Sequence, residues 1–147
     1  MPAEFFESLS DHKTPPTYYY FDGEAWKEST SGKTIAVTSP IEGEEVGRLQ
    51  VVSPDEMDAA VTRAKAAQPA WEATPLHERV KIVHLAADWI RQFEPYLTSL
   101  LVKEIGKSSG EAKSEIIRTA DIIDYFADEV QSIHGDTLDS DNFPGYD

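Results

Sequence analysis

The sequence of 147 residues contains no cysteine. That absence excludes disulfide bonds, a thiolate nucleophile and cysteine-ligated metal sites within these residues. Long apolar runs are also lacking, so no segment is predicted to span a membrane. The first residues have neither the basic nor the apolar stretch of a secretory signal, and we therefore expect a cytoplasmic protein.

Basic residues are scarce. The sequence has 13 Lys and Arg residues against 27 Asp and Glu residues, which gives a formal net charge of -14. Nucleic acids and anionic membranes bind proteins through Lys and Arg, so neither is expected as a partner. The ordinary explanation of such acidity is solubility through self-repulsion. In so negative a chain, an Arg that binds an anionic ligand needs local support.

Familiar catalytic signatures are missing too. The sequence has neither of the common Gly-rich phosphate loops and no G-x-S-x-G turn. The four histidines (His12, His77, His84 and His134) lack the spacing of metal ligands. His77 and His84 share one face of a predicted helix, but no third ligand is evident. No metal site is therefore predicted.

The first third of the chain carries strand and turn signals. Residues 1–17 are polar, include "TPP", and are expected to form a loose arm. Strand-like residues then follow in three stretches: 18–21, "KTIAVTSP" at 33–40 and "IEGEEVGRLQVV" at 41–52. They predict a small β-meander of about three strands. A sheet of this size needs a helical or intersubunit cover.

The remaining sequence predicts about four helices, so the expected class is α/β with mostly helical content. The first helix has a clear start, because Ser53, Pro54 and Glu56 supply an N-cap, a first-turn proline and a capping box. Pro69 is expected to end it. The second helix is expected to begin after Thr74 as its N-cap. The third covers about 95–105, with Gly106 as its C-cap, and the fourth covers about 110–133.

The fourth predicted helix is the most informative. At about 100° per residue, one stripe collects its small and apolar residues, namely Ala112, Ile116, Ala120, Ile123, Ala127 and Val130. Arg118 projects from nearly the opposite side and shares that side with Ile122 and Tyr125. These apolar neighbours predict a helix covered on two sides, with Arg118 partly buried. Two interpretations remain open: Arg118 makes a Glu115 ion pair or a subunit contact, or Arg118 binds an anion.

The order of several short motifs resembles the N-terminal part of the aldehyde dehydrogenase superfamily. The motifs are "FDGEAW" (21–26), "SPIEGEEVGRLQVVSPDEMDAAVTRAKAAQPAW" (39–71), "ERVKIVHLAADWI" (78–90) and "LLVKEIGKSSGEAKSE" (100–115). The resemblance covers residues 18 to about 137 and implies an aldehyde dehydrogenase-like α/β fold. It implies three parts: the arm at 1–17, part of the cofactor-binding domain at 18–134, and the start of an oligomerisation extension at 135–147.

Within the superfamily, "SEIIRTADIIDYFADEVQSIHGDTL" (114–138) is most similar to the non-phosphorylating, NADP-dependent glyceraldehyde-3-phosphate dehydrogenases. In that family the Arg of a Ser-Glu-x-x-Arg-Thr-Ala helix contacts the substrate phosphate. The matching positions are Ser114, Glu115, Arg118, Thr119 and Ala120. The resemblance therefore implies that Arg118 is a substrate-binding residue. A guanidinium suits this role because it offers phosphate a bidentate fork and stays charged.

The resemblance also implies a reaction for the full-length protein. It would be oxidation of glyceraldehyde 3-phosphate, a phosphorylated aldehyde of glycolysis, to 3-phosphoglycerate with NADP or, as the alternative, NAD. In the family the catalytic Cys, the general base and the cofactor-binding segment lie further along. The present 147 residues are therefore expected to form an inactive N-terminal fragment, without any catalytic, cofactor-binding or metal-binding residue. A homo-oligomer, either tetramer or dimer, is also implied.

Two alternatives remain. The first is an aldehyde dehydrogenase for another small aldehyde, such as a semialdehyde or lactaldehyde, in which Arg118 is only a pairing residue. The second is a free-standing, non-catalytic helical interaction module.

Overall fold

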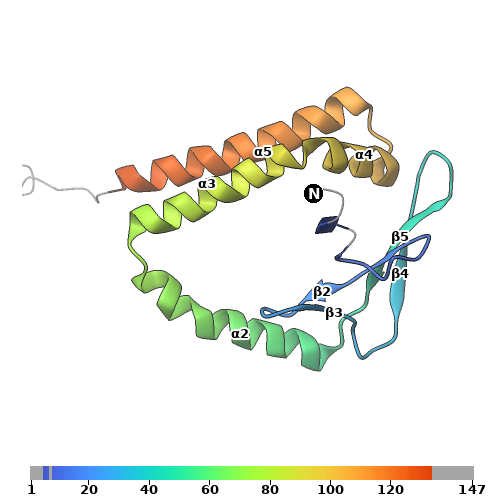
Figure 1. Cartoon of the computed structure of the whole chain (residues 1–147), viewed down its shortest axis with the longest axis horizontal. Coiled ribbons are helices and arrows are strands. Elements are labelled where there is room, and N and C mark those ends of the chain that lie inside the picture. Colours follow the sequence, from blue (N-terminus) through green and yellow to red (C-terminus); the bar gives the residue numbers. More distant parts are fainter. Residues whose placement is uncertain (1–4, 7, 134–147) are drawn as a thin grey trace, which may run out of the picture.

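The computed structural model describes residues 5–6 and 8–133 (Figure 1). Within this part of the chain, short strands precede helices: β1 (Thr17–Tyr18), β2 (Tyr20–Phe21), β3 (Trp26–Lys27), β4 (Thr34–Thr38) and β5 (Glu45–Gln50). The helices are α2 (Pro54–Ala73), α3 (Leu76–Gln92), α4 (Glu94–Ile105) and α5 (Ser109–Glu129), followed by the 3-10 turn η1 (Val130–Ser132). The predicted α/β class, a small sheet region and then four helices, is confirmed.

The strand pairing is not a meander. The sheet has the order β1-β5-β4, with β1 parallel to β5 and β4 antiparallel to it, while β2 and β3 form a separate hairpin. Parallel pairing joins strands that are distant in sequence, which local turn signals do not reveal. Gly47 permits the pairing, because a Cβ there would lie 3.2 Å from the Cε2 atom of Tyr18.

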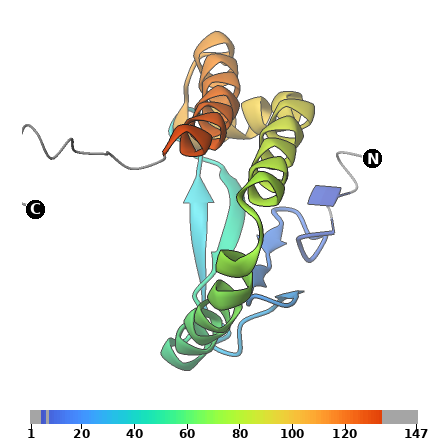
Figure 2. The same cartoon turned by 90° about the vertical axis from the view of Figure 1, so that its left-hand side faces the viewer.

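Three helices form a layer in which α3 and α5 run antiparallel and α4 packs at one end (Figures 1 and 2). The buried apolar residues of this layer are Val80, Ala87, Ala112, Ile116, Ala120 and Ala127. Four of them belong to the predicted stripe of α5, so its orientation is confirmed. Small side chains at these positions allow the helix axes to approach closely.

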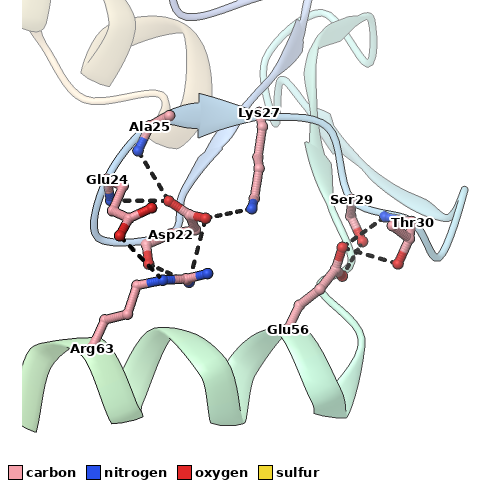
Figure 3. Close-up of polar contacts among 8 residues, drawn as sticks. All are labelled: Asp22, Glu24, Ala25, Lys27, Ser29, Thr30, Glu56 and Arg63. Atoms are coloured by element: carbon pink, nitrogen blue, oxygen red, sulfur yellow. Dashed lines mark hydrogen bonds and ion pairs between the residues drawn. The ribbon is translucent and has the colours of Figure 1, made fainter.

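Helix α2 lies apart from this layer and is tied to the strand region by polar contacts (Figure 3). Glu56 forms the predicted capping box with Ser53. The same carboxylate accepts hydrogen bonds from the Thr30 N–H at 2.8 Å and the Ser29 hydroxyl at 2.7 Å. These hydrogen bonds hold the pKa of Glu56 well below its ordinary value. One acidic residue thus starts the helix and fixes the loop after β3.

Asp22 supplies the second link between α2 and the β2–β3 hairpin. Asp22 is only 3% exposed, and its carboxylate accepts hydrogen bonds from the backbone N–H groups of Glu24 and Ala25, each at 2.9 Å. Lys27 and Arg63 form ion pairs with the same carboxylate, the latter at 3.3 Å. The hydrogen bond from Lys27 lowers the pKa of Asp22 most, and the two backbone N–H donors lower it further. The hairpin turn and the middle of α2 are therefore held by one carboxylate (Figure 3).

Two predicted helix boundaries were wrong. Helix α2 continues through Pro69 to Ala73. A proline removes only one backbone hydrogen bond, and on a helix without buried residues the freed carbonyl can be solvated. Thr74 ends α2 rather than starting α3, since its hydroxyl donates to the Ala70 carbonyl oxygen at 2.9 Å. Helix α3 then begins one residue after Pro75.

The described part of the N-terminal arm packs against the helices. The Phe6 ring stacks on Tyr96 with centroids 4.2 Å apart, and Phe5 stacks on Phe93 at 5.7 Å. The predicted extension at 135–147, and His134 before it, lie outside the described residues. Within 5–6 and 8–133, no helix has the length and apolar character to cross a membrane.

Gly106 provides a test of the turn between α4 and α5. Its φ is 75°, and an added Cβ would lie 3.1 Å from Pro40 Cγ and 3.2 Å from Ile41 Cγ1. We expect Gly106→Ala to lower the free energy of unfolding by about 1–2 kcal/mol, because an L side chain is strained in the left-handed region. Urea unfolding measures the change.

Gly110 is the matched control. It lies in the first turn of α5, and a Cβ there meets nothing within 4 Å. Gly110→Ala is expected to leave the free energy of unfolding unchanged or to raise it by up to about 1 kcal/mol. Equal destabilisation by the two substitutions would contradict the assignment of Gly106 as a required left-handed cap.

Candidate functional site

Arg118 lies on the outward side of α5, opposite the buried alanines. It borders a groove of about 640 Å³, called here the Arg118 groove. Residues at helical spacing along α5 line most of the groove, and the turn before α5 adds Lys107 as a second cation. The lining residues of the groove are Lys107, Gly110, Glu111, Ser114, Glu115, Arg118, Thr119 and Ile122. Matching positions of the predicted phosphate motif, Ser114, Glu115 and Thr119, thus share the groove with Arg118.

The Arg118 guanidinium has no ion pair or hydrogen bond to any residue within 5–6 and 8–133. Glu115, its predicted partner, is instead paired with Lys107. Glu111 is also engaged, because it accepts the Ser108 hydroxyl at 2.8 Å at the start of α5. Both carboxylates of the groove therefore have partners other than Arg118. The predicted alternative of an Arg118–Glu115 pair is not what the structure shows.

Lys107 is the groove residue that sequence reasoning missed. It lies in the turn between α4 and α5, eight residues before Glu115, so helical periodicity does not relate the two. The one sequence feature that relates Lys107 to Glu115 is that both lie in the motif at residues 100–115. The pairing depends on the tight turn at Gly106, whose φ is 75°.

The expectation that this side of α5 is covered was wrong within the described residues. Ile122 is 49% exposed and Tyr125 is 60% exposed. Apolar side chains alone indicate a covering surface but do not show where the cover is. Arg118 itself is exposed. It is thus an open cation beside an apolar strip, rather than a partly buried charge.

A charge network between α3 and α5 holds the helix that carries Arg118. His84 Nδ1 lies 2.6 Å from Asp124 Oδ1, and His84 Nε2 lies 3.1 Å from Asp128 Oδ1. Arg91 bridges to Asp121 at 2.8 Å and to Asp124 at 2.6 Å. The Asp124 hydrogen bond raises the pKa of His84, and bonds from His84 and then Arg91 lower the pKa of Asp124.

The described residues do not fit a dinucleotide cofactor. A pyrophosphate binds well at a helix N-terminus that is free of negative charge. Acidic residues occupy the first turn of every helix from α2 to α5: Asp55 and Glu56, Glu78, Glu94, and Glu111. In this part of the chain there is also no group of three His, Asp or Glu residues arranged for a metal ion. No chemical step is therefore assigned to a cofactor held by these residues.

Known proteins resemble this chain in sequence and in fold. The sequence profile of the aldehyde dehydrogenase family matches residues 26–146. The NADP-dependent glyceraldehyde-3-phosphate dehydrogenase of Pisum sativum is 39% identical over 129 residues, which are 86% of this chain and 26% of the pea protein. The chain thus spans about a quarter of the length of the curated relatives it matches.

Solved structures agree with the sequence match. The NADP-dependent glyceraldehyde-3-phosphate dehydrogenase of Bacillus halodurans, complexed with NADP, has a TM-score of 0.78 and 35% identity, over 86% of this chain and 26% of that one. Lactaldehyde dehydrogenase from Escherichia coli has a TM-score of 0.78 and 29% identity, over 85% and 26%. The similarity in fold therefore extends to enzymes named for different aldehydes.

The α3–α5 charge network predicts a pH-dependent stability. The pKa of His84 is raised on folding, so protonated His84 stabilises the folded protein. This contribution is fully present below the pKa of His84 in the unfolded chain, about 6.5, and is lost as pH rises through the pKa in the folded protein. Asp124 has a lowered pKa, so its contribution is present above about 3.8 and is lost as pH falls. We expect His84→Gln to destabilise the protein most between about pH 4 and 6.5 and least at pH 9.

Urea unfolding of protein and variant at pH 5 and pH 9 measures this difference. His77→Gln is the control, since His77 is exposed on the same helix and contacts Glu78 at 3.1 Å. A His84→Gln effect of equal size at both pH values would contradict the network's role.

Proposed function

This chain belongs to the aldehyde dehydrogenase family, and we propose that it forms the N-terminal quarter of an enzyme that oxidises glyceraldehyde 3-phosphate to 3-phosphoglycerate with NADP. The 147 residues contain no Cys, so the cysteine nucleophile implied by the family resemblance would lie outside them. The acidic first turns of the described helices support a cofactor site formed by other residues. The role proposed for this chain is to present Arg118 to the substrate phosphate.

The observation that carries the proposal is that no described residue pairs with the guanidinium of Arg118. Both carboxylates that line the groove with Arg118, Glu111 and Glu115, bind other groups. A phosphate oxygen pair matches the two parallel N–H donors of a guanidinium in geometry and charge. The names of the pea and Bacillus halodurans proteins support glyceraldehyde 3-phosphate as the phosphorylated aldehyde.

A second candidate is an aldehyde dehydrogenase for an unphosphorylated aldehyde such as lactaldehyde. Its support is the TM-score of 0.78 to the Escherichia coli lactaldehyde dehydrogenase, equal to that of the Bacillus halodurans enzyme. If this second candidate holds, Arg118 of this chain would bind a carboxylate of another segment or subunit. The two candidates differ in what Arg118 recognises, so one substitution separates them.

The exposed apolar side chains favour a part of a larger assembly over a free-standing helical module. Helix α2 has no buried residue, and Val61 and Trp71 border one open apolar surface on it. Large apolar residues in such positions usually meet another protein surface. We propose a cytoplasmic homo-oligomer, a tetramer or a dimer, in keeping with the family resemblance.

Arg118→Ala tests the substrate. In the enzyme that contains this chain, we expect the KM for glyceraldehyde 3-phosphate to rise about 10- to 100-fold, as hydrogen bonds to charged groups contribute about 1.5–3 kcal/mol. The KM for unphosphorylated glyceraldehyde should change less than about twofold. Steady-state kinetics with both aldehydes distinguishes a loss of phosphate recognition, which raises only the KM for glyceraldehyde 3-phosphate, from a general loss of activity.

Arg48→Ala is the charge-matched control, because Arg48 is exposed on β5 and pairs with Glu45. It should leave both KM values within about twofold of the parent enzyme. If Arg118→Ala raised the KM of neither aldehyde, or of both equally, the phosphate-ligand proposal would be wrong and the second candidate would replace it.

A further inference from the structure

Lys107 and Glu115 form an ion pair inside the Arg118 groove, and the function described so far does not use it. Lys107 comes from the turn before α5, whereas Glu115 and Arg118 stand three residues apart on the helix itself. A Glu and an Arg at this spacing are natural partners on a helix surface. The chain nevertheless pairs Glu115 with Lys107, which leaves Arg118 unpaired among the described residues.

We infer that Lys107 is a positioning and specificity-determining residue for a phosphorylated substrate, because it withholds Glu115 from Arg118 and offsets the charge of that carboxylate. The inference rests on the proposed function. Without Lys107, Glu115 becomes an uncompensated anion beside the bound phosphate and a competing partner for the guanidinium. Both effects weaken phosphate binding and leave an uncharged aldehyde unaffected.

The geometry of the turn supports this role. Gly106 adopts φ 75° and its N–H donates to the Val102 carbonyl oxygen at 3.0 Å, which caps α4 at the residue before Lys107. Ser108 then caps α5 by accepting the Glu111 N–H at 3.3 Å. Lys107 is therefore held between two capped helix ends. From there its ammonium group reaches Glu115, in the second turn of α5.

Electrostatic magnitudes indicate a measurable effect. An exposed ion pair contributes little to stability on its own. Removing Lys107 also removes a positive charge and leaves a negative charge near a phosphate of about two negative charges. At an effective dielectric constant of about 20, charges several ångströms apart interact strongly enough to change a KM about tenfold. The combined change is therefore expected to exceed that of an ordinary surface pair.

The test uses four variants of the enzyme that contains this chain: Lys107→Met, Glu115→Gln, the double variant, and Lys107→Arg. We expect Lys107→Met to raise the KM for glyceraldehyde 3-phosphate about tenfold, with kcat within about twofold and the KM for glyceraldehyde unchanged. The double variant should return the KM for glyceraldehyde 3-phosphate to within about threefold of the parent, since the competing carboxylate is gone. Lys107→Arg should preserve the parent values.

Lys103→Met is the matched control, because Lys103 is an exposed lysine in the last turn of α4 and has no ion pair within the described residues. It should leave both KM values unchanged. A double variant no better than Lys107→Met would overturn the inference, since Lys107 would then bind phosphate directly or act on the fold. Equal loss with both aldehydes would overturn it too. Arg118→Ala in the same series separates the two failures, because only the proposed function requires its selective effect.

Discussion

The burial of one stripe on α5 is the constraint on which the rest of the site depends. Ala112, Ile116, Ala120 and Ala127 are all buried against α3 and α4. A helix turns by about 100° per residue, so burying this stripe fixes the rotation of α5 about its axis. Arg118 must then project to the opposite side. The alanines also bring α3 close enough for His84 and Arg91 to reach Asp124, so the packing of small residues and the charge network support each other.

Charge pairing organises much of this acidic chain. Asp22 joins the β2–β3 hairpin to α2 through Arg63, Glu56 joins the following loop to the same helix, and Asp124 joins α5 to α3. Each carboxylate is satisfied by donors from a different element, which converts a surplus of negative charge into links between elements. Arg118 is one of the cations that no described carboxylate engages, and it borders the groove.

Local signals made some features predictable. Ser53 with Glu56, the C-cap Gly106 and the apolar period of α5 each involve residues within a few positions, and each was confirmed. Features that depend on distant residues were not found: the parallel pairing of β1 with β5, and the Lys107–Glu115 pair across a turn. The prediction that Pro69 ends the helix was wrong because the free-energy cost of a proline inside a helix depends on how exposed that helix is, and the sequence does not give this exposure. The exposure of Ile122 and Tyr125 shows the same limit, since an apolar face predicts a cover without locating it.

The groove also clarifies how a chain with a net charge of -14 could recognise a phosphate. The groove itself holds two cations, Lys107 and Arg118, and two carboxylates, Glu111 and Glu115, so its formal charge is zero. Charges beyond about 8 Å are largely screened at physiological ionic strength, and the distant acids therefore oppose binding only weakly. With no local excess of positive charge, attraction at long range is small, and recognition must come from directed hydrogen bonds of one guanidinium. Selectivity for a phosphorylated aldehyde would then depend on keeping that guanidinium free of carboxylates, which is the role we propose for Lys107.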